Sequence, residues 1–136
     1  MAVESFSLQI EKWTEETQKR VTLAVRKIAL DVFERIILKS PVDTGRFRGN
    51  WQVQIGSIPT GTLEIDDKSG QVTLAKAQAE VLGVKAGDTI FLINNLPYAR
   101  RLEYGWSNQA PEGMVRTTVA EYQPIVDQVV REINNG

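Results

Sequence analysis

A helical spacing of apolar residues extends from residue 8 to residue 39, with Thr17 at its one gap. Over about eight turns, this spacing predicts one long amphipathic helix, whose start Ser5 or Ser7 is expected to cap. The helix would be roughly 45 Å long, which exceeds the diameter of a compact domain of 136 residues. We therefore expect part of it to project and contact a partner. The alternative is a helix that bends over its own sheet and leaves only its polar N-terminal third solvated. The apolar positions are Ile10, Trp13, Val21, Ala24, Ile28, Val32 and Ile36, flanked by Val25, Ala29, Phe33 and Ile37.

Residues 40–51 end this helix. Pro41 has no amide hydrogen and disfavours helical angles at the residue before it, so the helix cannot continue. Asp43 is expected to accept a hydrogen bond from the amide two residues on, and Gly45 to take the positive φ of a tight reversal. The stretch therefore predicts a corner between the helix and a strand.

Alternating apolar residues after the corner predict a small sheet. Residues 51–55 and residues 63–65 alternate on either side of the breaker at 58–61, which is typical of a β-hairpin with one apolar face. Residues 89–94 are an almost unbroken run of β-forming residues, as expected of a central strand covered on both faces.

Three further helices are expected. Residues 72–82 predict a short helix, and residues 98–105 predict two helical turns that stop at Gly105, with Arg100 and Glu103 able to pair. Helical spacing from residue 115 to residue 133 contains Pro124, which should kink or split the last helix near Gln123.

We therefore expect a single domain, 1–136, of the α+β class. It would consist of a long N-terminal helix through residue 39, a small, mostly antiparallel sheet of about three to four strands with short helices at 40–110, and a C-terminal helix at 111–136.

The composition argues against most enzymes. The chain has no cysteine and no histidine, so the commonest nucleophile, general base and zinc ligands are missing. Its 16 basic and 17 acidic residues give a net charge of −1, which does not favour a polyanionic partner or an anionic membrane. Asp66 and Asp67 are paired carboxylates in a cluster of turn-forming residues, and we expect them in a solvated turn. No catalytic residue, metal or cofactor is predicted.

Several arginines could gather into a phosphate-binding surface. Most of them have Asp or Glu within a few residues, so ordinary ion pairs are the favoured interpretation. They are Arg46, Arg48, Arg100, Arg101 and Arg116.

Three blocks of sequence follow the long helix in a fixed order. They read Ser-Pro-Val-Asp-Thr-Gly-Arg-x-Arg-x-Asn-Trp at 40–51, Asn-Asn-x-Pro-Tyr-Ala-x-x-Leu-Glu-x-Gly at 94–105 and Pro-x-Gly-Met-Val-Arg at 111–116. In this order the chain resembles the minor tail or neck proteins of long-tailed bacteriophages and prophages, in the tail-completion family that includes the lambda Z-type proteins. Trp106 departs from the family pattern, in which a histidine or small residue is common, and residues 60–88 match no part of it.

The resemblance implies a non-enzymatic structural subunit of the virion, assembled in the host cytoplasm. Such a subunit forms a homo-oligomeric ring, most often sixfold, at the head-proximal end of the tail, where it completes the tube and helps join it to the head. Its other partners would be tail-tube, terminator or head-connector proteins, with DNA reached only through the lumen and no membrane contact. A tail terminator ring protein and a small carboxylate-dependent phage enzyme, such as a muramidase or nuclease, are the alternatives.

The resembling blocks supply the candidate structural and interface residues. Trp51, Tyr98 and Trp106 are candidate anchors, since aromatic side chains give large contact areas at interfaces. Each motif also has an intramolecular interpretation: Asp43 and Thr44 would bind turn amides, Asn94 would cap the short helix, and Trp51 would fill the core, as the strand alternation favours. The candidates are Pro41, Asp43, Thr44, Gly45, Arg46, Arg48, Asn50, Trp51, Asn94, Pro97, Tyr98, Arg100, Glu103, Gly105, Trp106 and Arg116.

Overall fold

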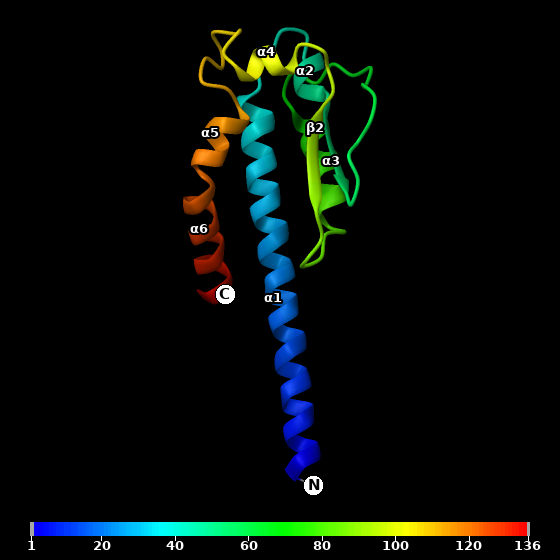
Figure 1. Cartoon of the computed structure of the whole chain (residues 1–136), viewed down its shortest axis with the longest axis vertical. Helices are drawn as coiled ribbons and strands as arrows, with labels where there is room; N and C mark the ends of the chain where they lie inside the picture. Colours follow the sequence, from blue (N-terminus) through cyan, green and yellow to red (C-terminus); the bar gives the residue numbers. More distant parts are fainter. Residues whose placement is uncertain (1, 136) are drawn as a thin grey trace.

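A computed structural model describes the fold of residues 2–135 and the side chains of residues 9–135. One long helix lies between two groups of elements: the small sheet and α3 on one side, and α5 and α6 on the other (Figure 1). This arrangement confirms an α+β fold with a long N-terminal helix and a small antiparallel sheet. The elements in order are α1 (Ala2–Lys39), α2 (Arg46–Gly49), β1 (Trp51–Ile55), α3 (Gln71–Val81), β2 (Ile90–Asn94), α4 (Ala99–Glu103), α5 (Val115–Ala120) and α6 (Tyr122–Asn135).

Helix α1 ends at Lys39, as Pro41 predicts, but begins at Ala2, six residues before the predicted start. Its 38 residues make it roughly 57 Å long. The C-terminal half packs against α3, α5 and α6, whereas the N-terminal half projects beyond every other element (Figure 1). The expected projection is therefore confirmed. The expected caps, Ser5 and Ser7, have side chains outside the described residues.

The core lies where α1, the corner and the sheet meet. Trp51 has 8% of its surface exposed. Its indole Nε1 donates to Ser40 Oγ at 2.7 Å, and that hydroxyl donates to the Ile36 carbonyl at 2.8 Å. Trp51 thus fills the core, as the strand alternation favours, and ties β1 to the end of α1. The buried cluster consists of Ile36, Ile37, Phe47, Trp51, Leu74, Ala77, Leu96, Leu102, Ala110 and Met114.

The sheet differs from the sequence-based expectation. Within residues 2–135 it has two antiparallel strands, β1 and β2, in register from Trp51 opposite Asn94 to Ile55 opposite Ile90. The predicted hairpin with residues 63–65 is wrong, and so is the central position of residues 89–94, since every β2 residue is half-buried.

A side chain takes the place of the missing hairpin partner. Asn50 lies fully buried before β1, and its Oδ1 accepts the Leu63 amide at 2.7 Å while its Nδ2 donates to the Leu63 carbonyl at 3.1 Å. Because both backbone groups of Leu63 are occupied in this way, they are not available for hydrogen bonds of a strand ladder, and residues 63–65 form no strand.

The predicted short helices are present as α3 and α4. The predicted C-terminal helix divides at Glu121 into α5 and α6, which places Pro124 in the first turn of α6. A proline is tolerated there because the amides of the first turn have no partner within the helix. The predicted split is confirmed, two residues earlier than expected.

Candidate interaction surface at the corner

Gly45 fixes the corner. Its φ is +94°, and a Cβ atom there would lie 2.5 Å from the Lys68 amide nitrogen. The Gly45 carbonyl accepts the amides of Gly49 at 2.9 Å and Asp67 at 3.0 Å, so the reversal is packed directly against a second loop. The corner is therefore rigid because two backbone segments touch where no side chain intervenes.

The side-chain acceptor of this turn is Thr44. Its hydroxyl accepts the Arg46 amide at 3.2 Å, whereas Asp43 lies exposed and makes none of the described hydrogen bonds of the turn. The prediction that the Asp43 carboxylate accepts a backbone amide of the turn is therefore wrong.

Arg48 joins the corner to the end of α1. Its guanidinium donates to the carbonyls of Leu38 at 2.9 Å, Ser40 at 2.8 Å and Lys68 at 2.8 Å. Burial lowers the pKa of Arg48. The expected carboxylate partner is replaced by backbone carbonyls, because the last carbonyls of a helix lack intrahelical partners.

Asp67 corrects the interpretation of the acidic pair. Asp66 is exposed as expected, but Asp67 has only 5% of its surface exposed. Its carboxylate accepts the Thr73 amide and hydroxyl, each at 2.8 Å, and the Gly70 amide at 3.1 Å. Burial alone would raise the pKa of Asp67, but these bonds outweigh it and lower the pKa. The carboxylate holds the start of α3, and an acidic residue just before a helix was the signal for this role.

The fold brings the first two sequence blocks together around one hollow, which we call the corner groove. It has a volume of about 340 Å³. Gln109 closes one side by donating to the Val42 carbonyl at 3.0 Å and accepting the Val42 amide at 2.9 Å. The groove is lined by residues 41–47 together with Tyr98, Arg101, Leu102, Trp106, Ser107 and Gln109.

Aromatic and cationic side chains stand open at this groove. Trp106 is 74% exposed and Tyr98 is 38% exposed. The Arg101 guanidinium lies 5.6 Å from the centre of the Trp106 ring, and the ring of Tyr98 lies 6.2 Å from that of Phe47. Arg46 also lines the groove, and among residues with described side chains its one ion pair is a long one, 3.8 Å, with the exposed Glu64. Such a surface is suited to binding a protein segment.

Three further residues of the second sequence block lie near the corner groove: Asn94, Pro97 and Gly105. Asn94 Nδ2 donates to the Phe47 carbonyl at 2.9 Å, and Asn94 Oδ1 accepts the Leu96 amide at 3.3 Å. Asn94 therefore joins β2 to α2. The prediction that it caps α4 is wrong. Pro97 lies exposed between β2 and α4. Gly105, at φ +89°, ends the segment after α4 in the predicted left-handed conformation.

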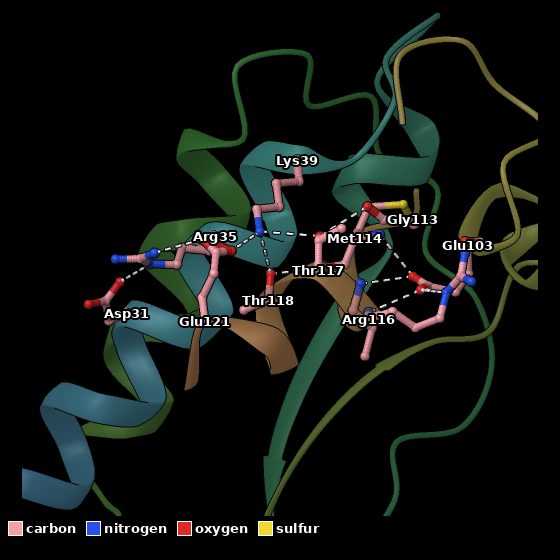
Figure 2. A network of polar contacts seen from close by, with 11 residues as sticks. Asp31, Arg35, Lys39, Glu103, Gly113, Met114, Arg116, Thr117, Thr118 and Glu121 are labelled. Carbon is pink, nitrogen blue, oxygen red and sulfur yellow. Dashed lines mark hydrogen bonds and ion pairs between the residues drawn. The ribbon is translucent and has the colours of Figure 1, made fainter. Parts of the chain in front are cut away.

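Glu103 does not pair with Arg100. Arg100 lies 6.0 Å from the Tyr104 ring centre, and the Glu103 carboxylate instead receives Arg116 Nε at 3.1 Å (Figure 2). The same carboxylate accepts the amides of Met114 at 2.9 Å, Val115 at 2.8 Å and Arg116 at 3.1 Å. Burial acts to raise the pKa of Glu103, but the amide bonds outweigh it and lower the pKa. The third sequence block is thereby anchored to the second.

A second cluster, which the sequence analysis missed, holds the other end of α5. Glu121 accepts Arg35 Nη1 at 2.9 Å and pairs with Lys39, whose ammonium also bonds the hydroxyls of Thr117 at 3.2 Å and Thr118 at 3.1 Å (Figure 2). The bond from Lys39 is the main cause that lowers the pKa of Glu121. The spacing of Arg35 and Lys39 on one face of α1 was a signal for an acidic partner, but it did not indicate which one.

Replacing Glu103 by Gln is expected to lower the free energy of unfolding by about 2 kcal/mol, because three amides and a guanidinium lose their ionised acceptor. Since folding lowers the pKa of Glu103, its contribution is present above about pH 4 and is lost as the pH falls through the lowered pKa. Urea unfolding of both proteins at pH 7 and pH 3 should show the difference shrinking in acid. Glu112→Gln, at an exposed neighbouring position, is the control. An equal loss in the two variants would contradict the assigned role.

The described residues contain no group of three or more side chains suited to holding a metal ion. Among the helices of residues 2–135, none is long and apolar enough to cross a membrane.

A family model with the description "Bacteriophage HK97-gp10, putative tail-component" matches residues 4–105, well over half of the chain. The chain belongs to this family. The match includes most of α1, the corner and the sequence up to Gly105, and it confirms the resemblance to phage tail or neck proteins. No curated protein and no solved structure matches the chain. The protein is thus a phage tail component, which places it in the virion.

Proposed function

We propose that this tail component is a non-enzymatic structural subunit that forms a ring at the head-proximal end of the phage tail, where it completes the tail and helps join it to the head. The observation that carries the proposal is the projecting half of α1. Residues 9–20 of this helix are all exposed, including Ile10 at 48% and Trp13 at 67%. Exposed apolar side chains on a projecting helix favour contact with another subunit.

The shape of the subunit supports a ring. The projecting end of α1 and the corner lie at opposite ends of the molecule (Figure 1). Two different surfaces at opposite ends favour a heterologous contact, in which one surface of each copy docks on another surface of the next, and such contacts give a ring when the rotation closes. The neighbouring tube, terminator or connector proteins would bind the two faces of that ring.

Three carboxylates with lowered pKa values support a structural role. An enzyme that uses a general acid would need a carboxyl group with a raised pKa. In Asp67 and Glu103 the pKa is instead lowered by hydrogen bonds from backbone amides, and in Glu121 mainly by Lys39. All three carboxylates are therefore ionised and are used to hold helices in place.

Removing residues 2–20 is expected to abolish oligomers of the purified protein while leaving the domain folded, because the described side chains of that segment are exposed. Light scattering at increasing concentration measures the assembly, and circular dichroism the fold. Leu82→Ser, at a 69% exposed position at the end of α3 and outside the removed segment, is the control and should assemble normally. Assembly of the shortened chain with the native stoichiometry would contradict the role of the projecting helix.

Particles made without this protein separate the two ring functions. Loss of a completion protein should give tails of normal length that fail to join heads, and electron micrographs of a lysate would show free tails and filled heads. Overlong tails would instead identify a tail terminator. Intact, infectious particles would refute both.

A further inference from the structure

We propose that the projecting helix of one copy docks in the corner groove of the next copy. The docking segment is residues 9–17 of α1, and the receiving surface is the corner groove. This inference rests on the proposed ring and names the two surfaces that form it.

The docking segment is apolar along one line and acidic around it. Ile10 and Trp13 lie three residues apart and therefore share a face of the helix. Both side chains are exposed, at 48% and 67%. The segment carries three carboxylates, from Glu11, Glu15 and Glu16, against the single ammonium of Lys12. Glu16 follows Trp13 by three residues and so lies on the same face, next to the indole.

The corner groove offers the complementary chemistry. Its apolar lining includes Phe47, Leu102 and the exposed Trp106, so an indole entering it would contact other rings. Two guanidiniums, from Arg46 and Arg101, line the groove against the single carboxylate of Asp43. Neither guanidinium has a short ion pair among the described residues: Arg46 has one of 3.8 Å, and Arg101 lies against the Trp106 ring. The groove is therefore basic and aromatic where the segment is acidic and aromatic.

The segment cannot reach the groove of its own chain. Trp13 and Pro41 are separated by 28 residues, nearly all within one continuous helix, which corresponds to about 42 Å. The contact must therefore join two copies. Each copy carries one segment and one groove. The projecting end of α1, which contains the segment, and the corner, which lines the groove, lie at opposite ends of the molecule (Figure 1), so the contact is heterologous and repeats from copy to copy.

Cysteine cross-linking of the full-length protein tests this contact, because the chain contains no cysteine of its own. Gln9→Cys places a thiol one turn before Trp13, and Ser107→Cys places one in the groove lining. The chain carrying both substitutions should form disulfide-linked multimers larger than a dimer under mild oxidation, since each copy links to two neighbours. The chain with Ser107→Cys alone should stay monomeric on a non-reducing gel.

Two controls make the result specific. Gln9→Cys combined with Gln78→Cys, on the exposed surface of α3, should give few multimers. Equal linking by this pair would overturn the proposal. The chain with Gln9→Cys alone tests whether projecting helices pair with each other. Abundant dimers of this variant, together with no species larger than a dimer from the chain carrying both Gln9→Cys and Ser107→Cys, would also overturn the proposal.

Charge reversal tests the ionic part of the contact. Arg101→Glu in the doubly substituted chain should reduce the yield of multimers by about fivefold, and adding Glu16→Arg should restore most of it. A lack of multimers from a protein that light scattering shows to be assembled would reject the docking site and leave the proposed ring intact. The proposed function is tested separately, by electron micrographs of particles made without the protein.

Discussion

Gly45→Ala is expected to lower the free energy of unfolding by about 3 to 5 kcal/mol, one of the largest losses that a single methyl group could cause in this protein. The added Cβ would lie 2.5 Å from the Lys68 nitrogen and 2.7 Å from Asp67 backbone atoms, and the φ of +94° already disfavours any residue with a side chain. These neighbouring atoms belong to the backbone, so they cannot relieve the clash by a rotamer change as a side chain could. Thermal unfolding should show a midpoint lower by well over 10 °C.

Gly61→Ala is the matched control. Gly61 also has a positive φ, +77°, but a Cβ there would meet no atom within 4 Å. This variant carries only the conformational cost, about 1 kcal/mol. If both variants lost the same stability, the close approach of the two backbone segments at the corner would not be the cause.

Asp67→Ala is expected to cost about 3 kcal/mol at pH 7. The buried amides of Thr73 and Gly70 and the Thr73 hydroxyl would lose their acceptor, and each unsatisfied buried donor is costly. Folding lowers the pKa of Asp67, so its contribution is present above about pH 4 and disappears as the pH falls through the lowered pKa. Chemical unfolding at pH 7 and at pH 3 should therefore show the variant approaching the parent protein in acid.

The adjoining carboxylate provides the comparison for that experiment. Asp66 is exposed and Asp67 is buried, although they are neighbours in the chain. Asp66→Ala should change the free energy of unfolding by less than about 0.5 kcal/mol at either pH. A loss at Asp66 as large as that at Asp67 would show that the net charge of the loop matters more than the hydrogen bonds.

The contacts in the structure divide the residues of the sequence blocks that resemble phage tail proteins into two classes. Gly45, Arg48 and Trp51 make backbone or core contacts that set the direction of α1 relative to the sheet. Tyr98 and Trp106 stay exposed at the corner groove. Substitutions in the first class should therefore change stability, and substitutions in the second should change assembly.

The sequence alone predicted the long helix and its end at Pro41, the short helices and the break ahead of Pro124. It also showed the resemblance to a phage tail family. The structural features among these depend on interactions within a few residues: helical spacing, a missing amide hydrogen, or a left-handed glycine. Such local rules act wherever the segment lies in the fold. They therefore also located the corner and the two helical turns at 98–105, but they did not show that these two segments meet to form a groove.

The tertiary structure alone decided the pairings between distant segments. The partner of β1 is β2 and not residues 63–65, because Asn50 occupies the backbone groups of Leu63. Glu103 binds the start of α5, and Asp67 is buried beneath α3. In each case several partners are compatible with the local sequence. The choice depends on which donors are left unsatisfied when the core closes, and only the packed structure determines that.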